Sequence, residues 1–298
     1  MQKDYHCSYS ILGTDVICEY KCAHPQLPPS ITLHNHDGYE IVLFLSGEHV
    51  TIYVESERKE LVRGDLILIN SYTFHGLSLI DSSNYERVVI NIEERYLKKI
   101  STENTDLSCC FHQSSPNALN LIHLNESEIS HFMAISSNLE RAMKEEHYGH
   151  DILKRALLSE LLIYINMIRP ASAPPSYSNT IPEIVSNTFT YIEKNLTTNI
   201  TVEKMARSLH HNSDYLSRCF REATGYTLKH YVLAKRIALA QKYLREGSSP
   251  YDVCFFIGFN NYSSFSRAFS KQIGCSPKQY QLMYRKKIRA EVCMNRQW

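Results

Sequence analysis

Three histidines and one glutamate stand within the first hundred residues at spacings suited to holding a metal ion. His34-x-His36-x3-Glu40 leads into a run that reads as a strand, and His75 lies beside a later one. Alternation along an extended chain places His34 and His36 on one side, and Glu40 shares their parity across a slight irregularity at residues 37–38. With His75 from a neighbouring strand, they form a candidate three-histidine, one-carboxylate set for Fe, Mn, Ni or Zn.

A second pattern with chemical consequences is an internal repeat in the C-terminal half. The motif LSRCF-x4-G at residues 216–225 recurs 49 residues later as FSRAF-x4-G at residues 265–274. In each copy the apolar residues are four apart on one helix face, the Ser-Arg pair lies on the opposite face, and the glycine falls where a C-cap belongs. Each copy follows a short helix and a turn, at residues 201–212 and 250–261. This order predicts a helix-turn-helix built twice.

The second helix of a helix-turn-helix presents its N-terminal side chains to base edges in the major groove. Arginine can read guanine through two hydrogen bonds, whereas serine more often holds phosphate. The residues expected in the core instead are Leu216, Phe220, Phe265 and Phe269. The side chains expected to contact DNA are Asp214, Ser217, Arg218 and Arg221 in the first copy and Tyr262, Ser263, Ser266, Arg267 and Lys271 in the second, with Arg221 and Lys271 at phosphates.

The charge of the chain is divided between its two halves. The 298 residues carry a formal net charge of only +1, but residues 1–180 hold 14 Lys and Arg against 23 Asp and Glu, and residues 181–298 hold 18 against 8. The two parts therefore carry −9 and +10. A domain with that excess of positive charge attracts phosphates, which dominate the affinity of proteins for nucleic acids. The positive charge and the repeated helix-turn-helix pattern both predict that the C-terminal half binds DNA.

The elements that position these residues change character along the chain. Residues 30–95 hold short β-branched or aromatic runs between turn residues, which predict an antiparallel barrel or sandwich. Residues 126–168 switch to helical period and predict two helices that meet near residues 148–151, with a capping box that begins at Asn125. Residues 170–180 are rich in proline and small polar residues and predict a linker.

A longer pattern surrounds the repeat and gives the C-terminal half a family resemblance. Its positions are Ile200-Thr201, Ala206, Leu209, Leu216-Ser217-Arg218, Phe220, Thr224-Gly225, Arg236, Ala240, Leu244, Gly258-Phe259, Phe265-Ser266-Arg267, Phe269, Gly274, Pro277 and Tyr280. This stretch resembles the double helix-turn-helix domain of the AraC/XylS family of transcription regulators. The resemblance implies that a long helix from about Thr227 to Leu244 holds both readers in successive major grooves. It also implies activation through contact with RNA polymerase, at genes of carbohydrate or related metabolism.

The histidine pattern of the N-terminal half carries a second resemblance. The spacing from His34 through Glu40 to Gly47 resembles the first motif of cupins, and residues 64–65 with His75 resemble the second. In the second motif an asparagine stands where proline is usual. The resemblance implies a cupin-like barrel that binds a small effector, often a sugar in AraC-family sensors. The residues expected to line its pocket are His34, His36, Tyr39, Glu40, Tyr72, Phe74 and His75.

Several interpretations of this N-terminal half remain open. The histidines can line an effector pocket without a tightly bound metal, or hold a divalent metal that assists effector binding, or serve only the packing of a structural barrel. A metal-binding cupin module or enzyme tethered to DNA is an alternative, and so is a regulator that needs no effector. A transcription regulator without catalytic activity is the function we expect. No cofactor is certain, and a divalent metal at His34, His36, Glu40 and His75 is the one candidate.

The sequence predicts an α+β multidomain protein with four parts. They are a cupin-like β-barrel sensor at residues 1–125, a helical pair for dimerisation at 126–169, a linker at 170–180 and an all-α AraC-type DNA-binding domain at 181–298. The expected partners are double-stranded promoter DNA, a small-molecule effector, RNA polymerase and a second copy of the chain. No apolar run approaches the roughly 20 residues of a membrane span, and the start lacks the apolar core of a signal peptide. We therefore expect no membrane contact, a cytoplasmic location and nine reduced cysteines.

Overall fold

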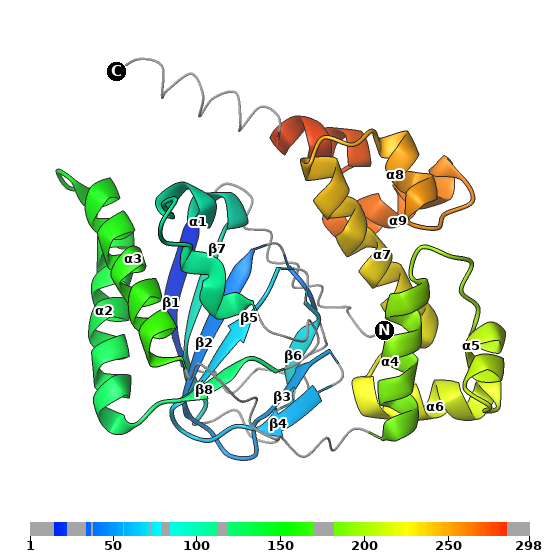
Figure 1. The fold of residues 1–298 in the computed structure, drawn as a ribbon, viewed down its shortest axis with the longest axis horizontal. Helices are drawn as coiled ribbons and strands as arrows, with labels where there is room; N and C mark the ends of the chain where they lie inside the picture. The colour runs from blue at the N-terminus through cyan, green and yellow to red at the C-terminus, as the bar shows by residue number, and fades with distance from the viewer. Residues whose placement is uncertain are drawn as a thin grey trace. The chain divides into compact units, whose positions relative to one another are not determined.

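The computed structural model describes residues 15–22, 34–36, 38–55, 57–71, 73–78, 84–112, 119–169 and 182–284. These residues divide into two compact units, with the boundary between Ile181 and Pro182 (Figure 1). The N-terminal unit combines sheets and helices, and the described part of the C-terminal unit is helical. The expected α+β multidomain class is confirmed. The expected linker at residues 170–180 lies outside the described residues.

Two antiparallel sheets form the centre of the N-terminal unit. The larger sheet has the strand order β1-β7-β2-β5-β8, and the smaller has the order β4-β3-β6. The strands of the larger sheet are β1 (Val16–Cys22), β2 (Tyr39–Ser46), β5 (Asp65–Ile69), β7 (Glu86–Ile92) and β8 (Leu121–His123). Those of the smaller sheet are β3 (Thr51–Val54), β4 (Glu57–Glu60) and β6 (His75–Ser78).

Strand β2 is covered on both faces and therefore belongs to two cores. Ile41 and Leu43 pack into the core that the larger sheet shares with helices, whereas Val42 and Phe44 pack into the core shared with the smaller sheet. A strand buried on both faces has a continuous apolar run instead of an alternating one, as β2 does. Successive side chains of β2 therefore lie in different cores.

Helices cover the outer face of the larger sheet, where α2 and α3 run side by side in Figure 1. The predicted capping box is confirmed, because the Asn125 side chain accepts from backbone N–H groups and Glu128 accepts from the Asn125 N–H. Gly149, in the left-handed conformation, precedes the second long helix. The helices of this unit are α1 (Glu94–Ile100), the 3-10 helix η1 (Leu107–Phe111), α2 (Glu126–Lys144) and α3 (His150–Ile168).

The C-terminal unit contains two helix-turn-helix motifs, α5–α6 and α8–α9, joined by the long helix α7. Helix α4 packs against α6. The four apolar residues of the repeat are confirmed as core, because each is 0% exposed: Leu216, Phe220, Phe265 and Phe269. The helices are α4 (Glu183–Asn195), α5 (Val202–Ser208), α6 (Ser213–Thr224), α7 (Leu228–Arg245), α8 (Pro250–Phe256) and α9 (Tyr262–Ile273).

Candidate functional site

The two candidate reading helices, α6 and α9, are built by the same local rules. Asn212 caps α6 and Asn261 caps α9, each through a side-chain oxygen that accepts from backbone N–H groups of the first turn. Both helices end at a glycine in the left-handed conformation, Gly225 with φ 76° and Gly274 with φ 82°. The repeat seen in the sequence is therefore a structural repeat with matching start and stop signals.

The two turns differ by one residue, although each contains a left-handed position. His210 has φ 57° and lies two residues before the cap of α6, whereas Gly258 has φ 88° and lies three residues before the cap of α9. His210 is exposed, so its side chain meets no packed neighbours that would forbid it. A Cβ atom on Gly258 would lie 2.7 Å from Nη2 of Arg236 and 3.0 Å from the Thr197 carbonyl oxygen. The first turn therefore accepts a histidine at its left-handed position. The second turn needs glycine there, because it has no room for a Cβ atom.

The predicted DNA-contacting side chains lie on α6 and α9, opposite the buried apolar stripe of each helix. Most are exposed, and three are half-buried. The exposed ones are Asp214, Arg218, Arg221, Ser263, Arg267 and Lys271, and the half-buried ones are Ser217, Tyr262 and Ser266. The structure thus brings each predicted set onto one helix surface. Contact with DNA itself stays a prediction.

Local contacts orient several of these basic side chains. The guanidinium of Arg218 lies over the Tyr215 ring, 5.6 Å from its centroid. Nε of Arg267 donates to the Ser263 carbonyl oxygen at 3.4 Å. A hollow of about 370 Å³ lies beside α6, and its polar lining includes two arginines and a lysine of the next helix. Its lining residues are Val202, Ser217, Arg218, Arg221, Thr227, Leu228 and Lys229.

Lys229 was not among the residues predicted to contact DNA. It stands in the first turn of α7, whose N-cap Thr227 accepts from the His230 N–H, and it lines the same hollow as Arg218 and Arg221. A lysine two residues after a threonine cap is a signal that the sequence contains, but nothing in the repeat points to it. The basic surface of the first motif therefore extends from α6 to the start of α7.

Arg236 of α7 joins the segment that leads into the first motif to the turn of the second. Its Nε donates to the Leu196 carbonyl oxygen at 2.9 Å, its Nη1 donates to the Gly258 carbonyl oxygen at 3.0 Å, and its Nη2 donates to the Thr198 carbonyl oxygen. The first and third acceptors lie between α4 and α5, and the second lies in the turn of α8–α9. One side chain therefore ties the segment between α4 and α5 and the turn of α8–α9 to α7. The family pattern includes this arginine, but no role was predicted for it.

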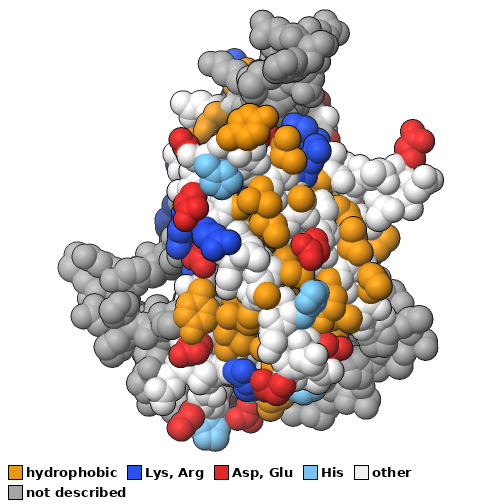
Figure 2. Space-filling view, turned by 90° about the vertical axis from the view of Figure 1, so that its left-hand side faces the viewer, with side chains coloured by type: hydrophobic (Ala, Val, Ile, Leu, Met, Phe, Trp, Pro, Cys, Tyr) orange, Lys and Arg blue, Asp and Glu red, His pale blue; other side chains and the backbone are white. Residues whose placement is uncertain are grey.

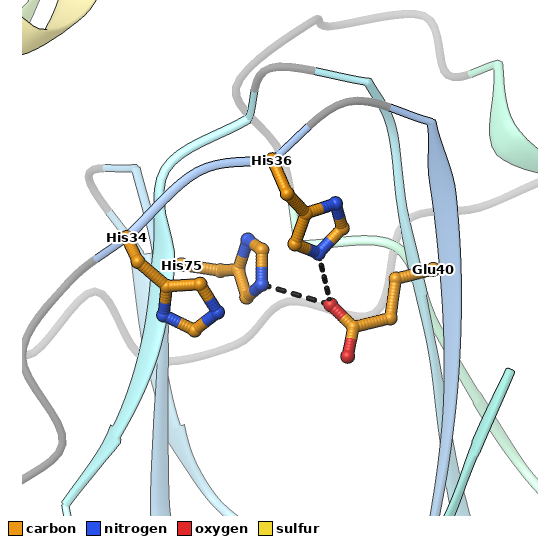
Figure 3. A group of neighbouring side chains, drawn as sticks. All are labelled: His34, His36, Glu40 and His75. Atoms are coloured by element: carbon orange, nitrogen blue, oxygen red, sulfur yellow. Dashed lines mark hydrogen bonds and ion pairs between the residues drawn. The ribbon is translucent and has the colours of Figure 1, made fainter. Parts of the chain in front are cut away.

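In the N-terminal unit the structure brings together His34, His36, Glu40 and His75 (Figure 3). Oε2 of Glu40 lies 2.6 Å from Nε2 of His36 and 2.9 Å from Nε2 of His75. His34 and His75 exchange backbone hydrogen bonds of 2.8 and 2.9 Å, and their ring centroids are 4.3 Å apart. Glu40 comes from β2 of the larger sheet and His75 from β6 of the smaller sheet, so the cluster joins the two sheets.

Charge and burial oppose each other at Glu40. Burial raises the pKa of its carboxyl, but the charge of His36 and the hydrogen bonds of His36 and His75 hold that pKa well below its ordinary value. Nδ1 of His75 lies 2.9 Å from the Thr73 carbonyl oxygen, which can only accept, so this nitrogen carries a proton. The contact to Thr73 fixes the orientation of the imidazole ring and leaves its Nε2 directed at Glu40.

Three other predicted effector residues do not join this cluster in the same way. Tyr39 faces the helix-covered core, where its ring stacks on Phe111 with centroids 4.4 Å apart, because it is one position from Glu40 on β2. Its contact with an effector stays a prediction. Phe74 is buried, and its backbone exchanges hydrogen bonds with Glu55. Tyr72 lies outside the described residues.

The donor atoms of the cluster are close enough for one ion. One ligand atom from each of the four residues lies within 4.8 Å of the others, and three of the residues are buried. Two neighbours of a small metal ion stand roughly 3 to 4 Å apart when each lies about 2.0 to 2.2 Å from it. Small side-chain rotations would bring all four atoms to that range. The cluster thus fits a divalent metal as well as it fits its own hydrogen bonds.

Two family models match the two units. The model described as an AraC-like ligand binding domain matches residues 28–162, and the model described as a helix-turn-helix domain matches residues 205–283. The curated relatives include an uncharacterized HTH-type transcriptional regulator, YbfI of Bacillus subtilis, with 26% identity over 77% of this chain and 79% of that protein. They also include the HTH-type transcriptional activator RhaR of Mannheimia succiniciproducens, with 21% identity over 96% of this chain and 99% of that protein.

Among solved structures, ToxT from Vibrio cholerae aligns over 90% of this chain and 98% of its own length, with 16% identity and a TM-score of 0.38. In the described residues, no helix combines the length and the apolar character that crossing a membrane requires.

An effector-binding unit followed by two helix-turn-helix motifs defines a DNA-binding regulator of transcription. The chain belongs to the AraC/XylS family of transcriptional regulators, as its resemblance predicted.

Proposed function

We propose that this regulator reads promoter DNA with both α6 and α9 and acts in the cytoplasm as an activator. The observation that carries the proposal is the structural repeat. Two helices with matching asparagine caps and glycine stops present an exposed arginine at equivalent positions, Arg218 and Arg267. Both motifs pack against α7, and Arg236 ties the turn of the second motif to the segment that leads into α5, so the two helices can engage one duplex together.

The chemistry of these helices supports a division of labour. Arg218 and Arg267 stand where a recognition helix faces base edges, and each bidentate contact to guanine is worth about 1–3 kcal/mol of discrimination. Arg221 and Lys271 lie one turn further along and supply phosphate contacts. The serines and Tyr262 contribute hydrogen bonds to phosphates or bases. Asp214 lies in the first turn of α6, where its negative charge also interacts favourably with the positive end of the helix dipole.

The test is the affinity of the full chain for a duplex selected from a random pool. We expect Arg218→Ala and Arg267→Ala each to weaken binding to the selected duplex by about 1–3 kcal/mol, or roughly 5- to 150-fold, in fluorescence anisotropy. The matched control is Arg141→Ala, which removes one exposed positive charge from α2 of the N-terminal unit. Equal affinity of the wild type and both variants would contradict the proposal.

We further propose that the chain is a homodimer that pairs through α3. Ile152, Ala156, Ile163 and Met167 are exposed on this helix and fall within an arc of roughly 60° at 100° per residue. Figure 2 shows hydrophobic side chains gathered on this side of the molecule. A second copy would cover the stripe and would place two double readers on one promoter, which raises affinity through avidity.

The oligomeric state follows directly from sedimentation velocity. We expect the wild-type chain to sediment as a dimer and Ile163→Glu to shift it toward monomer, because the substitution places a charge in the centre of the apolar stripe. Ser137→Glu on the exposed side of α2 adds the same charge elsewhere and serves as the control. A wild-type monomer at micromolar concentration would rule this pairing out.

The remaining parts of the proposal concern control. We propose that a small-molecule effector, a sugar or related metabolite, binds the N-terminal unit and prefers one of two arrangements of the regulator. The regulator then contacts RNA polymerase, and it catalyses no reaction of its own. The name of the relative RhaR, a transcriptional activator, supports activation. A melting-temperature screen of the full chain against a sugar panel tests the effector, since a ligand of the native state must raise stability.

A further inference from the structure

We propose that His34, His36, Glu40 and His75 bind one divalent transition-metal ion between the two sheets of the N-terminal unit. The proposal goes beyond DNA reading and does not depend on it. It rests on the geometry of four side chains from three separate segments of the chain. Residues 34–36 enter the unit ahead of β2, Glu40 stands on β2, and His75 begins β6.

The first feature of the cluster is that its side chains converge from different parts of the fold. Side chains from β2 and β6 belong to different sheets, yet the Glu40 carboxylate and the His75 imidazole approach to 2.9 Å. The backbone bridge between His34 and His75 brings a third ring to the same place, with His34 and His36 ring centroids 5.9 Å apart. Figure 3 shows the four side chains directed toward a common centre.

The second feature is the direction of the His75 ring. Its Nδ1 donates to the Thr73 carbonyl oxygen, which directs Nε2 at the carboxylate oxygen of Glu40, 2.9 Å away. An imidazole nitrogen and a carboxylate oxygen are both ligand atoms for divalent transition metals, and this separation is close to that of two neighbouring ligands of one ion.

The third feature is an unsatisfied atom. Nδ1 of His36 is buried and has no hydrogen-bond partner in the part of the chain that the structure describes. Buried polar atoms are almost always paired in folded proteins, and an unpaired one calls for an explanation, of which a bound ion nearby is one. Four side chains alone therefore do not satisfy the polar atoms of this cluster.

The donor set favours particular ions. Three imidazoles and one carboxylate suit Zn²⁺, Fe²⁺, Mn²⁺ or Ni²⁺, whereas Ca²⁺ and Mg²⁺ prefer sites made of oxygen atoms. The Thr73 carbonyl that orients His75 supplies the outer-shell contact that metal-bound histidines usually have. An ion at this place would join β2 to β6 and to residues 34–36, so it would stabilise the whole unit against unfolding.

The test uses the full chain without an affinity tag, stripped with a chelator, passed over a desalting column and offered Zn²⁺, Mn²⁺, Ni²⁺ or anaerobic Fe²⁺. We expect elemental analysis after gel filtration to find about one ion per chain for at least one metal, with a rise of several degrees in melting temperature. Glu40→Gln and His36→Ala should lose the ion and the shift. His147→Ala, which removes an exposed histidine between α2 and α3, should keep both.

The outcomes separate this proposal from the proposed function. Circular dichroism of Glu40→Gln, a substitution of nearly equal volume, checks that the variant folds. Failure of all four metals to bind the wild type would overturn the metal site, and so would equal binding by the wild type and folded Glu40→Gln. Affinity for the selected duplex, measured on the same samples, reports on DNA reading whatever the result for the metal.

Discussion

At the scale of single residues, Gly258 and Arg236 show how one turn can depend on a distant side chain. Gly258 has φ +88°, and a Cβ atom added to it would lie 2.7 Å from Nη2 of the Arg236 guanidinium. Gly225 also has a positive φ, +76°, but its Cβ position meets nothing within 4 Å. The two glycines share the same backbone requirement and differ in the space around them. They form a matched pair for separating strain from packing.

We expect Gly225→Ala to destabilise the C-terminal unit by about 1 kcal/mol. The left-handed conformation costs an L-residue about 1–2 kcal/mol, and alanine regains part of this because it loses less conformational entropy on folding than glycine does. Gly258→Ala should cost about 1–3 kcal/mol more, since the added methyl group displaces the Arg236 guanidinium from its hydrogen bonds to three backbone carbonyl groups. Urea denaturation followed by circular dichroism measures both. Equal losses for the two variants would show that Arg236 moves aside without cost.

Two neighbouring cysteines in the N-terminal unit offer a second comparison. Cys109 is exposed, whereas burial raises the pKa of the Cys110 thiol to about 12, and burial likewise raises the pKa of Cys18 to about 12. Thiolates react with alkylating agents and thiols do not. At pH 8, iodoacetamide should therefore modify Cys109 in the native chain and spare Cys18 and Cys110 until urea is added.

The direction with pH follows from the raised pKa values. Thiols with a pKa of about 12 stay almost wholly protonated between pH 7 and 9, so raising the pH over that range should not make Cys18 or Cys110 reactive while the chain stays folded. Tandem mass spectrometry distinguishes the adjacent residues Cys109 and Cys110. Labelling of Cys110 at the rate of Cys109 would mean that the core around η1 is open to solvent.

At the scale of elements, the sequence predicts long periodic segments well and short ones poorly. Helices α2 and α3, and the caps of the repeat, follow from periodicity and from individual capping residues. Strand β4 was not predicted, because its run Glu57–Glu60 is wholly charged and is held only by pairing with β3. β8 has three residues, too few for a periodic signal.

The same reasoning explains which site residues could be found from sequence. The parity of His34, His36 and Glu40 identified a cluster that the structure assembles, because period two survives the irregularity before β2. Tyr39 lies outside this cluster, and the sequence did not show it because a strand that is apolar on both faces carries no alternation to tell the two faces apart. Arg236 was missed as a connector because its acceptors are backbone carbonyls, which carry no sequence signal.

Arg236 gives a prediction about how the elements cooperate. Arg236→Lys keeps the positive charge, but the single ammonium nitrogen of lysine cannot reach the three carbonyl oxygens that the forked guanidinium group bonds. We expect the C-terminal unit to lose about 1–3 kcal/mol of stability. We also expect a larger loss of affinity for a duplex that spans both motifs than for one that carries a single half-site. Lys242→Arg at an exposed position of α7 is the control, and a uniform loss on both duplexes would argue against a connecting role.

At the scale of the whole molecule, the division of charge and the division of structure coincide. The boundary at residues 181–182 separates a −9 half from a +10 half almost at the same residue. The acidic half has no electrostatic reason to approach DNA, and the basic half attracts phosphate. Family membership and the charge division therefore assign DNA binding to the C-terminal half on separate grounds.

Hydroxyl-radical footprinting on the selected duplex shows whether both motifs read one piece of DNA. We expect each chain to protect two patches on one face of the DNA, separated by about 10 base pairs, the repeat of the double helix. Arg218→Ala should weaken protection of one patch and Arg267→Ala protection of the other. A single patch per chain, lost in one variant and unchanged in the other, would contradict the claim.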